Sequence, residues 1–116
     1  MASGLNIASS AQSTSNDIQE TITSANATSA TQVVAKVAGE QIYITDVIIS
    51  VDTAMNVQLQ DDAGSPVVLM EQIYIPANSV FSKQFRTPLE VATNQDLDVI
   101  TSVSGNISVT VTGTQE

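Results

Sequence analysis

Few side chains of this protein could carry out covalent or acid–base chemistry. The sequence contains no His and no Cys, which excludes a Ser-His-Asp triad, a cysteine nucleophile and a zinc site with His or Cys ligands. Serine is abundant, but a serine nucleophile needs a base within hydrogen-bonding distance. Ser82 and Lys83 are adjacent in sequence, and adjacent residues of a strand point to opposite faces of a sheet. We therefore expect a solvated lysine beside an ordinary strand serine, in a protein that is not an enzyme.

The carboxylates are the other groups that could bind or react. Asp96 and Asp98 are two residues apart, so on a strand they would share a face about 7 Å apart and could form half of a calcium site. No segment has the spaced Asp or Asn ligands and closing Glu of a calcium loop, and Asp61-Asp62-Ala63-Gly64 is more typical of a hairpin turn. Glycoside hydrolysis by paired carboxylates is not favoured by this pattern. We expect no cofactor, and calcium near Asp96 and Asp98 stays an open alternative.

The composition also limits the partners. Lys36, Lys83 and Arg86 are the only bases against 12 acids, and the formal net charge is −9, so contact with nucleic-acid phosphates has almost no cationic groups to use. The apolar runs are far shorter than the roughly 20 residues that span a membrane. Sugar-binding sandwiches usually stack sugar rings on exposed aromatics, whereas Tyr43 and Tyr74 lie in apolar runs typical of packed sheet faces. We expect neither a nucleic-acid nor a membrane partner.

The composition changes sharply near residue 32 and divides the chain into an arm, residues 1–31, and a body, residues 32–116. Of the first 31 residues, 23 are Ser, Thr, Ala, Asn or Gln. Such a segment has too few apolar side chains to offset an ordering cost of about 1–2 kcal/mol per residue. We predict an extended polar arm that lies on the surface of another chain. The segment 17–22 could be a short strand or a helical turn. The predicted partner-binding residues of the arm are Leu5, Ile7, Ile18 and Ile22.

The body has the pattern of β-strands. Apolar and polar residues alternate in 55–60 and 106–112, which places one side of each strand on a core and the other, made of Asn, Gln, Ser and Thr, outward. Within 41–51 the apolar residues change parity, which predicts a β-bulge near Thr45 and Asp46. We predict an all-β fold: an antiparallel two-sheet sandwich of seven or eight strands. A jelly roll is favoured, with an immunoglobulin-like topology as the alternative. Further strands are expected in 66–75, 80–85, 89–91 and 96–103, with turns at 61–66, 76–79, 87–88 and 104–106.

Four segments of the body resemble small β-sandwich proteins of tailed-phage virions, and capsid decoration (cement) proteins are the best match. They are Ile75-Pro76-Ala77-Asn78-Ser79, Phe85-Arg86-Thr87-Pro88-Leu89, Asn94-Gln95-Asp96-Leu97-Asp98-Val99 and the closing strand 105–113. The resemblance covers residues 40–113 and consists of turn and strand patterns, with no matching motif for binding residues. It implies a jelly-roll-like body on the outside of a capsid, commonly as a trimer, with a terminal arm that reaches over adjacent capsomers.

The expected function is therefore that of a non-enzymatic virion protein on the outer capsid surface. It would stabilise the head by bridging neighbouring major capsid subunits, because it binds assembled subunits better than separated ones. Its expected partners are the major capsid protein and itself, as a homo-oligomer with a trimer favoured over a dimer, since several linked attachments raise the effective concentration of each. A net charge of −9 would repel DNA, consistent with an outer location. The alternative is a carbohydrate- or receptor-binding module on a virion or cell surface.

Overall fold

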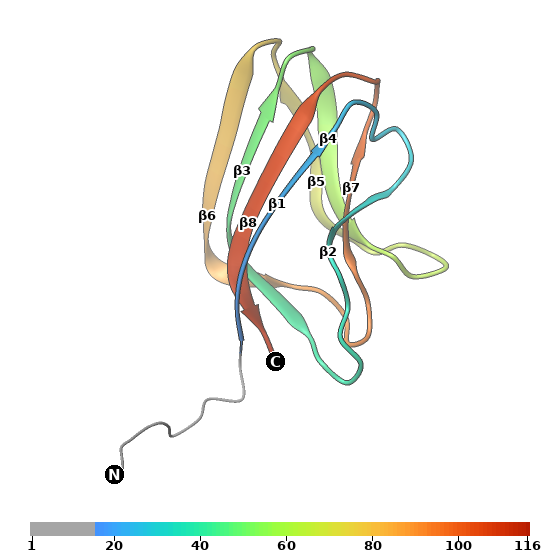
Figure 1. Ribbon diagram of the computed structural model, residues 1–116, viewed down its shortest axis with the longest axis vertical. Coiled ribbons are helices and arrows are strands. Elements are labelled where there is room, and N and C mark those ends of the chain that lie inside the picture. The colour runs from blue at the N-terminus through green and yellow to red at the C-terminus, as the bar shows by residue number, and fades with distance from the viewer. Residues whose placement is uncertain (1–15) are drawn as a thin grey trace.

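The computed structural model describes residues 16–116, and within that range the chain forms eight β-strands and no helix (Figure 1). The strands form two antiparallel sheets of four that face each other, which confirms the predicted sandwich. The strands are β1 (Asn16–Ser24), β2 (Thr31–Val34), β3 (Ile42–Val51), β4 (Met55–Asp61), β5 (Val68–Ile75), β6 (Ser79–Glu90), β7 (Leu97–Thr101) and β8 (Ile107–Gln115).

The first four strands pair with the last four in reverse order. β1 pairs with β8, β2 with β7, β3 with β6 and β4 with β5. Two further pairings, β3 with β8 and β4 with β7, complete a first sheet in the order β1-β8-β3-β6 and a second in the order β2-β7-β4-β5. This nesting is compatible with the jelly roll favoured from the sequence, which stays a prediction.

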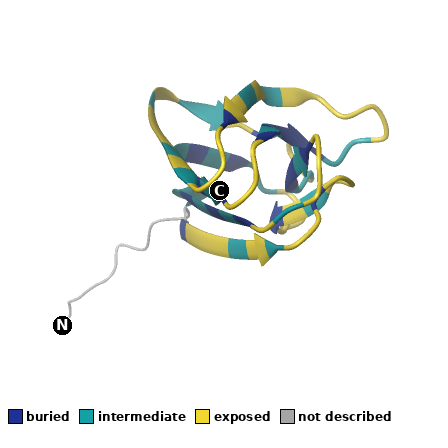
Figure 2. Ribbon diagram, turned by 90° about the horizontal axis from the view of Figure 1, so that it is seen from above, coloured by how far each residue is buried: buried dark blue, intermediate teal, exposed yellow. Residues whose placement is uncertain are grey.

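The core lies between the two sheets and follows from the alternation of apolar residues. In β8, Ile107, Val109 and Val111 are buried, while Ser108 and Thr110 between them point to the other face and stay half-buried. β4 alternates in the same way on the facing sheet. Figure 2 shows that buried residues lie within the strands and exposed residues along most of the connecting loops. Each fully buried aliphatic side chain contributes roughly 1.5–3 kcal/mol relative to an exposed one.

The predicted bulge in β3 is confirmed. Against β8, Ile44 pairs with Gly113 and Asp46 with Thr112, so Thr45 is the extra residue. The register against β6 shifts at the same place, but there residues 85–88 of β6 lie opposite Thr45. The Thr45 hydroxyl has one proton to donate, shared between Asp46 Oδ2 (3.0 Å) and the carbonyl oxygen of Thr112 (3.2 Å). The bulge brings β3 so close to Gly113 of β8 that a Cβ at this position would overlap the carbonyl oxygen of Tyr43. The glycine is therefore required by a close backbone approach.

The predicted boundary between arm and body at residue 31 is wrong for the part of the arm that the structure describes. Residues 16–24 form β1, which pairs with β8 along its whole length. Ile18 is buried and Ile22 packs against the core, because residues four apart share one side of a strand as well as one face of a helix. Ala27, in the loop after β1, is fully buried. The sandwich therefore includes residues 16–31, and only residues 1–15 of the predicted arm lie outside the described range.

Candidate functional site

The structure places Ser82 and Lys83 on opposite sides of β6, as predicted. Ser82 lies opposite the exposed Ile48 in the register of β3 and β6, whereas Lys83 lies opposite the buried Val47. β6 is an edge strand, so Lys83 remains exposed, and its Nζ lies 5.8 Å from the centre of the Phe85 ring. A cation over a ring at this distance is a weak surface contact. The pair therefore lacks the geometry of a nucleophile and its base.

Acidic side chains gather at one end of the second sheet, where they organise loops. Asp61 Oδ1 accepts hydrogen bonds from the amides of Ala63 (3.1 Å) and Val67 (2.9 Å), which confirms the turn expected after β4. Asp62 Oδ1 accepts the amide of Asp96 (2.9 Å), and its Oδ2 lies 3.8 Å from Lys36 Nζ. The amide of Asp96 is the main cause that holds the pKa of Asp62 below its ordinary value. These carboxylates are thus largely occupied by backbone amides.

Asp98 differs from its acidic neighbours because, within residues 16–116, no backbone amide donates a hydrogen bond to its carboxylate, as amides do to Asp61, Asp62 and Asp96. It lies in β7, is 6% exposed, and has Gln32 of β2 and Gln60 of β4 opposite it in the register. Burial, followed by the charges of Asp62, Asp96 and Asp61, raises the pKa of Asp98 to about 6. The carboxyl group is therefore partly protonated in mildly acidic solution.

The expected pairing of Asp96 and Asp98 on one strand is wrong. β7 begins at Leu97, so Asp96 lies in the preceding loop, where its Oδ1 accepts the amide of Lys36 (2.6 Å). Within residues 16–116, no group of three or more acidic side chains is arranged to hold a metal ion. The structure thus gives no support to the calcium alternative.

The two tyrosines lie in different surroundings. Tyr43 is half-buried and its hydroxyl donates to Gln41 Oε1 (3.0 Å), as expected for a residue on a sheet face. Tyr74 is 66% exposed and lies opposite Asn56 in the register of β4 and β5. The prediction that Tyr74 is packed is therefore wrong, because β5 is an edge strand and its outer side is uncovered. An exposed ring of this kind is the sort of group that stacks on sugars.

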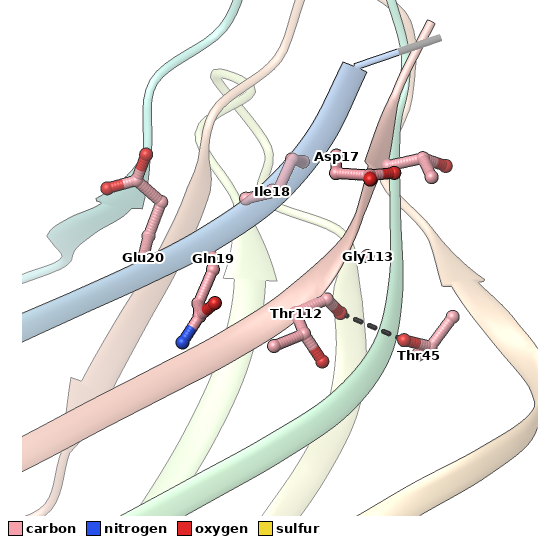
Figure 3. Close-up of a pocket in the computed structure, with 8 residues that line it drawn as sticks. Asp17, Ile18, Gln19, Glu20, Thr45, Thr112 and Gly113 are labelled. Carbon is pink, nitrogen blue, oxygen red and sulfur yellow. Dashed lines mark hydrogen bonds between the residues drawn. The ribbon is translucent and has the colours of Figure 1, made fainter.

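A shallow groove of about 680 Å³ lies over the bulge, where β1, β8 and β3 run side by side (Figure 3). Gln19 and Glu20 point to opposite sides of β1, and the hydrogen bond from Thr45 to Thr112 crosses from β3 to β8. The groove is open and polar, unlike the enclosed, mainly apolar pockets that hold small molecules. Its lining residues are Asp17, Ile18, Gln19, Glu20, Thr45, Thr112, Gly113 and Thr114.

Part of the outer side of the first sheet forms a regular lattice of three rows with twelve residues. We call these three rows the hydroxyl face, because seven of the twelve residues are Ser or Thr. The register continues beyond them in a fourth row, Asp17–Thr114–Tyr43–Glu90, in which Asp17 and Glu90 are exposed acids. Thr21 Oγ and Thr110 Oγ are hydrogen-bonded across strands (2.9 Å). The face also contains two exposed aliphatic residues, Ile48 (48% exposed) and Val80 (66% exposed). Across β1, β8, β3 and β6 the rows are Gln19–Thr112–Asp46–Gln84, Thr21–Thr110–Ile48–Ser82 and Thr23–Ser108–Ser50–Val80.

The hydroxyl face carries one charged residue, Asp46, and its carboxylate is already hydrogen-bonded within the chain. Asp46 Oδ2 accepts hydrogen bonds from the hydroxyls of Thr45 (3.0 Å) and Thr112 (3.0 Å). The other eleven residues are neutral, in a chain with 12 acids. The sequence predicts neutral polar residues on the outer sides of the strands, and the structure confirms this and adds that four strands present them on one surface.

Of the predicted anchor residues, the two that the structure describes do not lie on this surface. Ile18 and Ile22 point to the opposite side of β1 and belong to the core of their own sandwich, so assigning them to a partner is wrong. Leu5 and Ile7 lie outside the described residues. The hydroxyl face cannot be predicted from the pattern of any single strand, because it depends on which strands are neighbours.

Comparison with known proteins identifies no relative. No protein-family model matches the chain, and no curated protein is significantly similar to it in sequence. Within residues 16–116, no helix is long and apolar enough to cross a membrane. The surfaces described above are therefore the basis on which a function is assigned.

Proposed function

We propose that this protein is a non-enzymatic structural component of a virion, which binds the outer surface of a phage capsid and stabilises the head by bridging neighbouring major capsid subunits. The observation that supports it most is the hydroxyl face: twelve exposed or half-buried residues on one sheet surface with a single carboxylate, on an otherwise acidic sandwich. Such a surface suits contact with protein, because burying neutral hydroxyls costs far less than burying charges.

The remaining features agree with a scaffold in an outer location. A two-sheet sandwich is a rigid frame. The carboxylates of Asp61 and Asp62 at one end of the second sheet bind backbone amides and so hold the adjacent loops in place. The excess of acids would keep the protein away from packaged DNA. Attachment at many equivalent capsid sites would shift the equilibrium toward assembled subunits by mass action. We assign the contact with the major capsid protein to the hydroxyl face together with residues 1–15, with Leu5 and Ile7 as anchors.

The test uses heads of the phage that encodes the chain, prepared without it. Added protein should sediment with the heads, saturate at a fixed ratio to the major capsid protein, and raise the temperature at which the heads release DNA. A double variant, Leu5→Ser with Ile7→Ser, should bind at least tenfold more weakly, whereas Ala2→Ser with Ala8→Ser should bind normally. Absence of saturable binding by the unaltered protein would refute the proposed function.

The exposure of Tyr74 favours one other function, that of a carbohydrate-binding module. A flat ring at 66% exposure on an edge strand could stack on a sugar. Saturable binding on a glycan array that is lost with Tyr74→Ala, but kept with Tyr43→Ala, would support this alternative over capsid attachment.

A further inference from the structure

We propose that the outer side of the second sheet, around Asp98, binds the guanidinium group of an arginine side chain on a partner protein. This site is separate from the hydroxyl face, which lies on the first sheet. The proposal goes beyond the proposed function, because it names a contact that the isolated chain makes with a small cationic probe. Its test therefore needs no capsid, and its failure would leave the proposed function standing.

Asp98 is a largely buried carboxylate without a partner in its own chain. It is 6% exposed, and no other described residue donates a hydrogen bond to it. Among residues 16–116, Glu40 Oε1 is the one enclosed side-chain atom that lacks a partner, so the carboxylate oxygens of Asp98 must reach the outer surface of the sheet. An unpaired carboxylate in such surroundings costs stability unless a donor from outside completes it.

Three further carboxylates make the surroundings of Asp98 attractive to a cation. Asp61 ends β4, Asp62 follows it, and Asp96 directly precedes β7. Their charges, after burial, raise the pKa of Asp98. Lys36 offsets one of these charges, because its Nζ lies 3.8 Å from Asp62 Oδ2. Four carboxylates beside one ammonium leave an excess of negative charge when Asp98 ionises, and such an excess attracts cationic groups.

The residues beside Asp98 suit a planar organic cation better than a metal ion. In the described part of the chain, no three acids are placed to hold a metal, and backbone amides already bind the other three acids of this group. A guanidinium presents five N–H donors in one plane and can bind a carboxylate through two of them. Its remaining donors match the side-chain amide oxygens of Gln32 and Gln60, which lie on either side of Asp98 in the register. Gln60 Oε1 accepts one hydrogen bond from Gln58 Nε2 (3.0 Å) and keeps a second lone pair.

An exposed aliphatic residue continues the same row and gives an arginine chain an apolar contact. Val68 of β5 lies opposite Gln60 and is 40% exposed, and Val67 before it is 55% exposed. The methylene groups of an arginine pack on such a surface while its charged head binds a polar group. A lysine fits less well, because its ammonium lacks the planar fork. The row Gln32–Asp98–Gln60–Val68 therefore matches both the head and the stem of an arginine.

The cost of Asp98 in the free chain also indicates a binding role. Groups with perturbed pKa values cluster at functional sites, and residues kept for a ligand often lower the stability of the free protein. The charged groups that surround Asp98 are Asp61, Asp62, Asp96 and Lys36. Bound arginine would favour the ionised form of Asp98 and so lower its pKa. Binding should therefore be strong above the pKa of about 6 and weaken as Asp98 takes up a proton below it.

An NMR titration of the isotope-labelled full chain with N-acetyl-arginine amide tests the proposal at about 20 mM salt, where charges are weakly screened. At pH 7.5 the amide signals of Gln32, Gln60 and Asp98 should shift and saturate with a dissociation constant of about 1–20 mM, as expected for one ion pair with few further contacts. At pH 5, one unit below the pKa of Asp98, the affinity should be about tenfold lower. N-acetyl-lysine amide should bind at least threefold more weakly than the arginine probe.

Two variants separate binding at Asp98 from net charge and from misfolding. Asp98→Asn should bind the arginine probe at least tenfold more weakly and lose the pH dependence. This variant replaces an unpaired buried charge by a neutral group of the same shape, so it should fold at least as well as the unaltered chain. Glu71→Gln removes the same charge at an exposed position of β5 in the same sheet and should bind like the unaltered protein.

Four results would overturn the proposal. The first is the absence of saturable shifts up to about 100 mM probe. The second is normal binding by Asp98→Asn, and the third is equal binding of the lysine probe. The fourth is a titration with calcium chloride that shifts the same signals at lower concentration than the arginine probe, because a metal ion would then be the ligand.

Discussion

Replacing Asp98 by Asn should stabilise this protein at neutral pH. The folded chain raises the pKa of Asp98 to about 6 from its ordinary value of 3.8, so between these values the folded state holds a proton that the unfolded state has lost. The free energy of unfolding therefore falls as pH rises from about 4 to 6 and stays low above that range. An asparagine has the shape of the protonated acid and never ionises, so it avoids this loss.

The size of the effect follows from the pKa shift. At about 1.36 kcal/mol per unit, a shift from 3.8 to about 6 sets an upper limit of about 3 kcal/mol. Water at the open outer side of the second sheet screens part of this, which leaves about 1–2 kcal/mol. For a domain of this size, that difference corresponds to a rise of about 5–10 °C in melting temperature at pH 7.

Thermal unfolding from pH 3.5 to 7.5, followed by circular dichroism, measures the effect. The advantage of Asp98→Asn should be full at pH 7, shrink below pH 6 and vanish near pH 4. Glu71→Gln removes one charge at an exposed position of β5 in the same sheet and should shift the melting temperature by no more than about 2 °C, since surface charges contribute little. Equal melting of Asp98→Asn and the unaltered protein at pH 7, or an advantage that grows toward low pH, would refute the reasoning.

Two further predictions concern the first sheet. Gly113→Ala places a methyl group against the carbonyl oxygen of Tyr43 and should lower the free energy of unfolding by at least about 1–3 kcal/mol. In the control Gly64→Ala, the added Cβ meets no atom within 4 Å, so this variant should melt within about 2 °C of the unaltered protein. Similar melting of both variants would contradict the close approach at the bulge. Ile18→Ala should lower the free energy of unfolding by about 2–4 kcal/mol in urea titrations, because Ile18 lies in the core; unchanged stability would restore it to the set of partner-binding candidates.

Local patterns of the sequence predict most of the strands and turns and the bulge. The turn predicted at 87–88 is wrong, because β6 runs from Ser79 to Glu90 without a break. The change of parity in β3 locates the bulge at Thr45, because side-chain alternation is a property of one strand. β1 is predicted only as one of two alternatives for residues 17–22, a short strand or a helical turn, and its place in the sandwich is missed. Its sparse isoleucines do not look like a core strand, and the free edge of β8 that accepts it is about ninety residues away along the chain.

The candidate site is predicted only in part, because it depends on which strands are neighbours. The sequence shows that single strands expose Ser, Thr and Gln, but not that four of them align these residues in rows. The exposure of Tyr74 follows from the edge position of β5, which no local pattern contains. The separation of Asp96 from Asp98 follows from where β7 begins, a boundary that residue types alone place only within a few positions.

The pairing of the first strand with the last has a consequence for synthesis. β8 is the central partner of both β1 and β3, so until it emerges from the ribosome these two strands have no partner between them. Contacts between such distant segments are intrinsically slow to form. Until β8 is made, the isoleucines and valines that it covers in β1 and β3 stay exposed, so chaperone access during that interval should affect the yield of folded protein.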